Sequence, residues 1–347
     1  MKATPMILSI DTSCDETAAA LTEGRKVLSN VIYSQILLHQ KWGGVVPSIA
    51  KRAHQERIDW VIEKLKVKNQ KLKINDIDYI AVTQGPGLAI ALEVGINKAK
   101  ELSKKFNKKI IAVNHLEGHI YSPFVQNSKG NPKIDFNFPY LVLIVSGGHT
   151  NLVIFEDHLR YQVIGETIDD AAGEALDKAG KLLGLGYPAG PVIERLAAEV
   201  ENKDYYKFPR PMIREETLNF SFSGLKTAFY YFFKKMSEKE KNLQIKKLAS
   251  SFQEAVFDTL VIKTEKAILK TGIKNLLVVG GVSANFYLRK KIRQLVKKYK
   301  GSVLFPSFKY LCGDNAAMIG VVASYKAKKG MFVEDCERLD RIPRMSL

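Results

Sequence analysis

Two segments of this chain repeat the same order of elements, and this repetition constrains the fold more than any other feature of the sequence. The first segment, MILSIDTSCDETAAALTEGRKVLSNVIYS, begins at Met6 and reads as strand, polar hinge, strand, glycine turn and strand. The second, YLVLIVSGGHTNLVIFEDHLRYQVIGET, begins at Tyr140 and follows that order again. A duplicated unit of three strands predicts two similar lobes, each built on its own sheet.

Helices and buried strands alternate after each three-stranded unit. After the first unit, the pattern predicts a helix over about 50–65, a strand over DYIAVT, a helix over 88–106 and a strand over KIIAVN. In the second lobe, a mostly helical insertion of about 167–274 precedes the strand NLLVVGG. This alternation predicts an α/β fold with mixed sheets and helices on their faces.

The same pattern predicts the extent of the two lobes. The N-terminal lobe is expected over residues 1–125, together with a C-terminal helix of about 315–347 that packs back on it. The C-terminal lobe is expected over residues 126–314 and contains the helical insertion. A chain of 347 residues is long enough for two domains of ordinary size.

Composition limits the partners and the compartment. The chain carries 53 Lys and Arg against 36 Asp and Glu, a net charge of +17 that attracts polyanions, so nucleic acid is the first partner to consider. A lysine-rich composition with lysines on solvent-facing helices explains the charge equally well. No apolar run approaches the ~20 residues of a membrane-spanning helix, and the N-terminus lacks a signal-peptide pattern, so no membrane association and a cytoplasmic location are expected.

The segment NHLEGHIYS contains two histidines, His115 and His119, four residues apart. Asn114 is a natural N-cap for a helix that begins near His115, and a spacing of four places both imidazoles on one helix face, within reach of one metal ion. Glu117 points about 200° around the helix from the first histidine, which disfavours its use as a protease base. The three cysteines are widely separated and exclude a CxxC zinc site, so a carboxylate at a helix start, such as Asp314, is the natural third ligand.

Glycine-rich and acidic segments indicate where a phosphorylated ligand binds. Small residues in the two hinges (Thr12 and Ser13 in the first; Ser146, Gly147 and Gly148 in the second) allow backbone N–H groups to approach an anion. The segment VVGGVSANFYLRKK predicts a strand, a glycine break and a helix that begins near Ser283 or Asn285. In TIDDAAGEALDKAG, the helix dipole accounts for Asp169 and Asp170 at a helix start. It does not account for Asp177, which shares a face with Asp170 and Glu174.

With these motifs assembled, the sequence resembles the TsaD family of tRNA N6-adenosine threonylcarbamoyltransferases, which includes the archaeal and eukaryotic Kae-type proteins. The matching segments run in family order and are DTSCDETAAAL, GGVVPSIAKRAH, GPGLAIALEVGINKAK, NHLEGH, VSGGHT, DDAAGEALDKAGKLLGLGYPAGP, FSFSGLKTA, ASSFQEAV, GGVSANFYLR and CGDNAAM. The chain departs from the family pattern at Ser48, Ala189 and Gly313. The resemblance implies the two-lobed actin/sugar-kinase/Hsp70-like (ASKHA) fold, in agreement with the duplication.

The resemblance also implies an activity. Family members are acyltransferases that move the threonylcarbamoyl group from threonylcarbamoyl-AMP to N6 of the adenosine beside the anticodon, in tRNAs that read codons beginning with A. AMP is released. Expected partners are therefore tRNA, threonylcarbamoyl-AMP, a TsaB-like paralogue and a TsaE-like ATPase.

Site residues follow from the matched motifs. The resemblance implies that an iron or zinc ion (Fe²⁺ or Zn²⁺) is bound by His115, His119 and Asp314. Asp11 and Glu16, in the first hinge, are expected to assist catalysis. The residues expected to contact the adenylate are Ile144, Val145, Ser146, Gly147, Gly148, Asp177, Gly190, Glu194 and Asn285.

Three other functions use the same features. A metal-dependent O-sialoglycoprotein endopeptidase, the older family label, would use the same histidines but requires an acidic base that Glu117 is badly placed to supply. A non-catalytic ASKHA scaffold has no need to keep three metal ligands. An ATP-dependent small-molecule kinase is compatible with the fold, but a fold does not determine a function.

Overall fold

The computed structural model describes residues 4–67, 70–71 and 76–347. Contacts within the chain define two units. Unit 1 consists of Met1–His39, Val45–Phe136 and Pro306–Leu347, and unit 2 consists of Gln40–Gly44 and Asn137–Phe305. The lobe limits predicted from the sequence, 1–125 and 126–314, remain predictions. Among the described residues, no helix has the length and apolar character needed to cross a bilayer.

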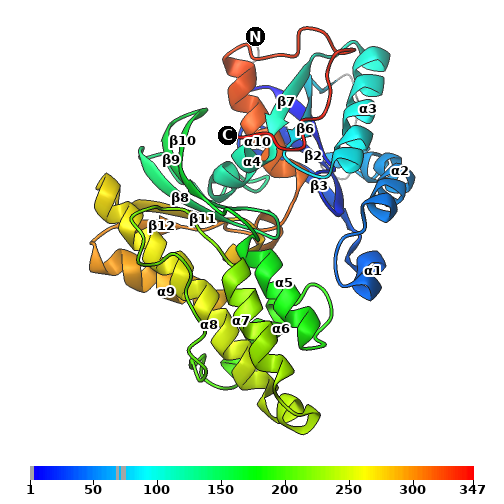
Figure 1. The fold of residues 1–347 in the computed structure, drawn as a ribbon. Helices are drawn as coiled ribbons and strands as arrows, with labels where there is room; N and C mark the ends of the chain where they lie inside the picture. The colour runs from blue at the N-terminus through cyan, green and yellow to red at the C-terminus, as the bar shows by residue number, and fades with distance from the viewer. Residues whose placement is uncertain (1–3, 68–69, 72–75) are drawn as a thin grey trace. The chain divides into compact units, whose positions relative to one another are not determined.

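The sheet of unit 1 has five strands in the order β3-β2-β1-β6-β7 (Figure 1). The first three strands form an antiparallel meander, and β6 and β7 continue the sheet parallel to β1. Because β1, β6 and β7 are parallel, their carboxyl ends lie at one edge of the sheet. The strands are β1 (Met6–Asp11), β2 (Glu16–Glu23), β3 (Lys26–Ser34), β6 (Tyr79–Gly85) and β7 (Ile110–Asn114).

Helices pack on this sheet, and a separate hairpin pairs β4 (Lys66–Val67) with β5 (Gln70–Lys71). Helices α2 and α3 pack on each other, and α10 packs on β1, β2, β7 and α4. The helices of unit 1 are α1 (Ile36–His39), α2 (Pro47–Glu63), α3 (Ala89–Phe106), α4 (His115–Tyr121) and α10 (Ala316–Lys328), with short 3₁₀ turns at Ser122–Phe124 and Lys309–Leu311.

The sheet of unit 2 repeats this plan in the order β10-β9-β8-β11-β12. Strands β8, β9 and β10 form the antiparallel meander, and β11 and β12 run parallel to β8. The duplication predicted from the sequence is therefore confirmed, strand for strand. The strands are β8 (Tyr140–Val145), β9 (Thr150–Asp157), β10 (Arg160–Glu166), β11 (Asn275–Val279) and β12 (Ser302–Leu304).

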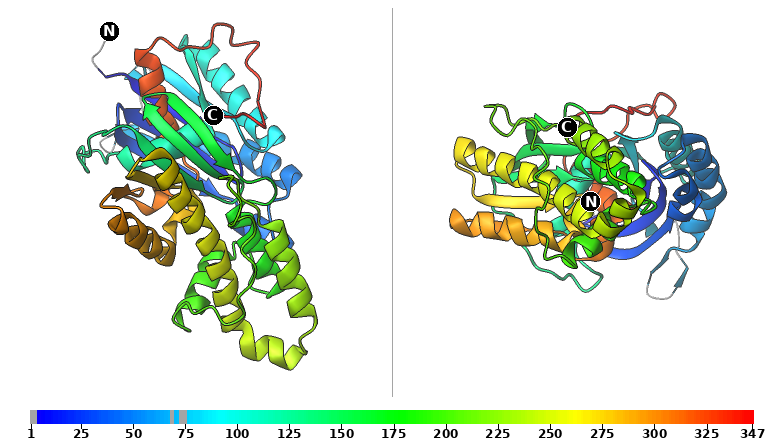
Figure 2. Two further views of the ribbon diagram at one scale, coloured as in Figure 1. Left: turned by 60° about the vertical axis from the view of Figure 1, so that its left-hand side comes forward. Right: turned by 60° about the horizontal axis from the view of Figure 1, so that its bottom comes forward.

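The predicted helical insertion of unit 2 is also present. Its helices bury one continuous core that includes Phe220, Phe229 and Phe252, and Figures 1 and 2 show α8 as the longest helix of this group. A 3₁₀ turn at Gly281–Ala284 follows β11 and leads into α9. The helices are α5 (Ala172–Leu182), α6 (Gly190–Ala198), α7 (Ser223–Lys234), α8 (Glu238–Thr271) and α9 (Phe286–Lys298), and a 3₁₀ turn at Gln40–Trp42 also belongs to this unit.

Helix α10 lies unusually close to the sheet of unit 1. Ser9 Oγ donates a hydrogen bond to the carbonyl of Ala316 at 2.6 Å, and a Cβ at Gly320 would lie 2.5 Å from Thr22 Oγ1. The sequence predicted helix as far as Leu347, but α10 ends at Lys328. Gly330, with a φ of 71°, turns the chain away from the helix, and the remaining residues follow an irregular path.

Asp169 and Asp170 connect the start of α5 with α7. Asp169 accepts hydrogen bonds from Ser221 Oγ at 2.5 Å, from Ser223 Oγ at 2.6 Å and from Phe222 N at 2.8 Å. Asp170 forms ion pairs with Lys178 at 2.5 Å and Lys226 at 2.8 Å. The helix-dipole interpretation of these two residues was therefore incomplete, because their main partners belong to α5 and to the segment that begins α7.

A Gly320→Ala variant should lower the free energy of unfolding by about 1–3 kcal/mol, because the added methyl group has no room against the sheet. Gly224→Ala in α7 is the matched control, since the nearest atom to its new Cβ is Pro211 Cγ at 3.8 Å. That control should gain up to about 1 kcal/mol from helix propensity. Urea unfolding followed by circular dichroism measures both, and equal stability of the two variants would contradict the close approach of α10.

Asp169 should stabilise unit 2 in a pH-dependent manner. Partial burial disfavours its charged form, but the hydrogen bonds from Ser221, Ser223 and Phe222 outweigh this effect and lower its pKa. A lowered pKa stabilises the fold above the unfolded value of about 3.9, and this contribution is lost as the pH falls through the folded value. Asp169→Asn should cost no more than about 1 kcal/mol at pH 7, since the carboxylate is exposed and screened.

The measurement is the difference in urea midpoint between the wild type and Asp169→Asn at a series of pH values. This difference should be constant at neutral pH and should shrink toward zero below about pH 4. A difference of the same size at every pH would show that the charge on Asp169 contributes nothing.

Candidate metal centre

His115 and His119 are positioned by the junction between β7 and α4. Asn114 is the last residue of β7 and the N-cap of α4, and its side chain accepts a hydrogen bond from Leu116 N at 2.8 Å. The Glu117 carboxylate accepts a hydrogen bond from Asn114 N at 3.2 Å, which completes a capping box. The predicted N-cap is confirmed, and the helix places both histidines on one face, as their spacing requires.

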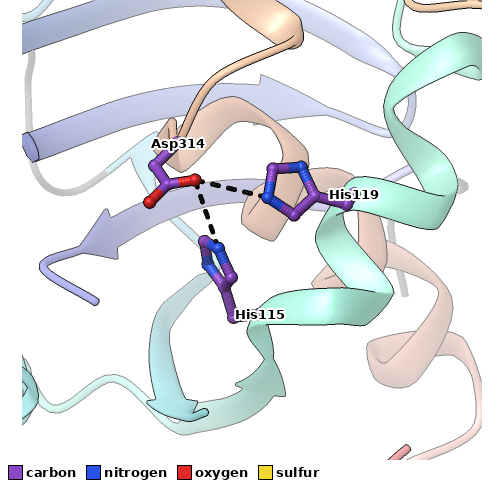
Figure 3. Close-up of side chains that lie close together, drawn as sticks. All are labelled: His115, His119 and Asp314. Atoms are coloured by element: carbon purple, nitrogen blue, oxygen red, sulfur yellow. Dashed lines mark ion pairs between the residues drawn. The ribbon is translucent and has the colours of Figure 1, made fainter. Parts of the chain in front are cut away.

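Asp314 joins the two histidines from a distant part of the sequence (Figure 3). It lies just before α10. The next residue, Asn315, is the N-cap of that helix, and its side chain accepts a hydrogen bond from Met318 N at 3.0 Å. Asp314 Oδ1 lies 3.3 Å from Nε2 of His115 and 3.3 Å from Nε2 of His119. One ligand atom from each of the three residues lies within 4.8 Å of the others.

The electrostatics of this group are those of a partly buried acid between two buried bases. Burial disfavours the charge on Asp314, but the neighbouring His115 and His119 outweigh it and hold its pKa well below the usual range. Burial likewise disfavours the charge on His115, yet the carboxylates of Asp314 and Asp11 raise its pKa to about 9. For His119, burial dominates and lowers the pKa.

These residues fit a metal ion. The side chain of His119 is fully buried, and within the described part of the chain neither of its ring nitrogens has a hydrogen-bond partner of good geometry. Such buried polar atoms are costly unless something else satisfies them. Ligand atoms about 2.0 Å from a tetrahedral ion lie about 3.3 Å apart, which matches the two distances from Asp314 to the histidines. Nitrogen and carboxylate donors of this kind suit iron or zinc.

Glu117 has a structural role on the opposite side of α4. Its carboxylate forms a buried ion pair with Lys326 of α10 at 2.7 Å, in addition to the capping box. The next residue, Gly118, allows the two helices to approach, since a Cβ there would lie 2.8 Å from Met318 Cγ. Glu117 therefore joins α4 to α10, the helix whose start carries Asp314.

The first hinge faces this group of ligands. Asp11, at the end of β1, has Oδ2 3.6 Å from Nδ1 of His115, and Ser13 Oγ lies 3.1 Å from the same nitrogen. Thr12 is buried and donates to the carbonyl of Ala91 at 2.9 Å. Burial, Asp15 and Asp314 raise the pKa of Glu16 well above its usual value.

The predicted adenylate residues all lie in unit 2. Ile144 and Val145 are fully buried in β8, whereas Gly147 and Gly148 are exposed in the loop that follows. This loop adjoins the start of α5, because Gly173 N donates to Ser146 O at 3.1 Å. The carboxyl ends of the parallel strands β8 and β11 lie together at this edge of the sheet, where open α/β folds bind ligands.

The other predicted adenylate residues lie at the ends of neighbouring helices. Asp177 of α5 accepts a hydrogen bond at 2.8 Å from Ala189 N, next to Gly190 at the start of α6. Asn285 is the N-cap of α9 and also donates to Gln253 Oε1 at 3.1 Å. The carboxylate of Glu194 accepts a hydrogen bond at 2.6 Å from the N–H of Phe286, the residue after Asn285. These contacts place Glu194 beside Asn285, and Asp177 beside Gly190.

The sequence did not identify several contacts that shape these sites. The sequence predicted Ser13 only as a small residue of the first hinge. Its position two residues after Asp11 is typical of a turn in which the N–H of Ser13 donates to the Asp11 carboxylate. No local signal indicates that Lys326 pairs with Glu117, because more than 200 residues separate them. Lys178 forms ion pairs with the carboxylates of Asp170 and Glu174 and so balances their charge. The spacing of four residues from Glu174 to Lys178 was a signal in the sequence that could have identified this pair.

Comparison with known proteins gives the same assignment as the motifs. The TsaD family model, described as tRNA N6-adenosine threonylcarbamoyltransferase, matches residues 26–321. A relative of that name from Caldicellulosiruptor saccharolyticus is 47% identical over 326 residues, which are 94% of each chain. Another, from Thermosipho africanus, is 43% identical over 343 residues, 99% of this chain and 100% of its own length.

A solved structure shares the fold. Full-length HypF, in a phosphate- and nucleotide-bound form, matches with a TM-score of 0.58 and 14% sequence identity. The match covers 96% of this chain and 57% of the HypF chain. Together with the two equivalent sheets, this likeness confirms the predicted α/β, ASKHA-like fold. From the family match and its full-length relatives, the chain belongs to the TsaD family of tRNA N6-adenosine threonylcarbamoyltransferases and is a transferase.

Proposed function

We propose that this protein transfers the threonylcarbamoyl group of threonylcarbamoyl-AMP to N6 of the adenosine beside the anticodon in tRNAs that read codons beginning with A. The observation that carries the proposal is the convergence of His115, His119 and Asp314 within 4.8 Å in a chain of the TsaD family. These three residues would bind one iron or zinc ion. The net charge of +17 supports binding of a polyanion such as tRNA.

The reaction is an acyl transfer. The N6 amine attacks the carbonyl carbon of the carbamoyl–phosphate anhydride, a C–N bond forms, the C–O bond to phosphate breaks, and AMP leaves. When bound, the ion supplies Lewis-acid polarisation of the carbamoyl carbonyl, which matters because an aromatic amine is a weak nucleophile. Glu16, with its raised pKa, is suited to accept the proton that N6 loses, and Asp11 supports the ligand His115.

Unit 2 is proposed to bind the adenylate. The exposed glycines 147 and 148 lie in the loop after β8. Apart from their chain neighbours, no atom of the described residues lies within 4 Å of where their Cβ atoms would be, so the backbone is open to a phosphate. The carboxylates of Asp177 and Glu194, together with Gly190 and Asn285, would contact the rest of the nucleotide. A TsaB-like paralogue and a TsaE-like ATPase are the proposed protein partners, and the cytoplasm is the proposed compartment.

The older endopeptidase function is not supported by the contacts of Glu117. A metal-dependent protease needs an acidic base next to the ion. The carboxylate of Glu117 instead pairs with Lys326 and caps α4. The non-catalytic scaffold is opposed by the three converging ligands, for which a scaffold has no use.

His115→Ala should abolish tRNA modification, with a loss of at least about 100-fold, because it removes one of three ligands and the Lewis acid with it. The assay supplies threonylcarbamoyl-AMP, a tRNA that reads an A-starting codon and the partner proteins, and detects the modified adenosine by mass spectrometry. His158→Ala, in the turn between β9 and β10, is the matched control and should retain activity. Full modification by His115→Ala would refute the metal mechanism.

Glu117→Gln separates transfer from peptidase chemistry. It should destabilise the fold, because Lys326 is left buried without its counter-charge, but the folded enzyme should keep its transfer rate. The double variant Glu117→Gln/Lys326→Met removes both charges and should recover much of the lost stability. Transfer rates and melting temperatures of both variants are measured side by side. A complete loss of activity in the stable double variant would give Glu117 a chemical role.

A further inference from the structure

The two ring nitrogens of His115 have different neighbours. Nε2 faces Asp314 Oδ1 at 3.3 Å, whereas Nδ1 lies 3.1 Å from Ser13 Oγ. Asp11 Oδ2 is farther from Nδ1, at 3.6 Å, which exceeds hydrogen-bond distance. If Nε2 binds an ion, the proton of the neutral ring is on Nδ1, and the hydroxyl of Ser13 is placed to accept that N–H.

Ser13 is itself tightly held. Only 2% of the Ser13 surface is exposed to solvent. Its carbonyl accepts a hydrogen bond from Leu88 N at 2.8 Å, and its N–H donates to Asp11 Oδ1 at 3.2 Å. Gly87 lies against it so closely that a Cβ there would be 2.5 Å from Ser13 O. The hydroxyl is therefore presented to His115 from a rigid turn.

The two histidines differ in this respect. Among the residues that the structure describes, neither ring nitrogen of His119 has a hydrogen-bond partner. Its ring packs edge-on against that of His115, with centroids 4.7 Å apart. An anchored His115 ring therefore also restricts the orientation of His119. The hydroxyl of Ser13 thus helps to orient both histidine rings.

The hinges of the two units differ in burial and in which groups they expose. In unit 2, the glycines that follow β8 are exposed. In unit 1, Thr12 and Ser13 are buried, and the Ser13 N–H already has Asp11 as its acceptor. The first hinge therefore does not offer the backbone N–H of Ser13 to an anion, and its hydroxyl faces a metal ligand instead.

We propose that Ser13 is a positioning residue of the metal centre, which accepts Nδ1–H of His115 and thereby directs Nε2 at the ion. This inference rests on the proposed function insofar as that function requires a bound ion. It assigns to the first hinge a role in metal affinity, separate from any contact with substrate.

The test measures metal binding without turnover. Metal-free wild type, Ser13→Ala and Ser103→Ala are titrated with Co²⁺, followed by its d–d absorption, and with Zn²⁺ in competition with a chromophoric chelator. Ser103 is the matched control, because it is a buried serine of unit 1 whose hydroxyl donates to the Lys108 carbonyl at 2.6 Å. Ser13→Ala should bind both metals about 10–100-fold more weakly and show an altered Co²⁺ spectrum. Ser103→Ala should match the wild type in both.

The outcomes separate this inference from the proposed function. Equal affinities and spectra for Ser13→Ala and wild type would overturn the role of Ser13 and leave the metal site intact. Absence of stoichiometric binding by the wild type would overturn both. A second measurement needs no variant: nitrogen-15 NMR of the zinc-loaded wild type should show His115 as the Nδ1–H tautomer. Zinc bound at Nδ1 would overturn the proposal.

Discussion

The contact between α4 and α10 is the interaction on which the candidate metal centre depends. The buried ion pair between Glu117 and Lys326 and the close approach at Gly118 fix the two helices to each other. One helix carries His115 and His119, and the other begins just after Asp314. A buried ion pair contributes little net stability by itself, but it specifies one arrangement strongly, since an unpaired partner is costly to bury. A single packing geometry is what three converging ligand atoms need.

Much of this architecture could be predicted from the sequence because it is local or repeated. The three-stranded units are recognisable as apolar runs separated by polar hinges and short turns. Asn114 and Asn285 cap their helices as their positions indicate. The spacing of His115 and His119 follows from helix geometry alone. A carboxylate at a helix start, such as Asp314, was the natural third ligand, and the resemblance to a family selected Asp314 and added most of the adenylate residues and the reaction.

The remaining features depend on contacts between distant segments, which periodicity does not reveal. The partners of Asp169 lie more than 50 residues away, and the hydroxyl of Ser13 reaches a histidine from another strand. The end of α10 at Lys328 was missed, although Gly330, two residues later, is of the type that commonly ends a helix. For Asp169 and Ser13, the sequence indicated the type of side chain, but the tertiary structure determined which residue it contacts.

Unit 1 is built from both ends of the chain, since Met1–His39 and Val45–Phe136 pack with Pro306–Leu347. Its sheet is complete once β7 has been synthesised, but α10, which packs on β1 and β2, begins more than 200 residues further along the chain. A nascent chain that stops before Asp314 therefore has two histidines without their carboxylate and an uncovered sheet face. An ion could be bound by all three residues only after synthesis has passed Asp314, so a product truncated before that residue would lack the complete site.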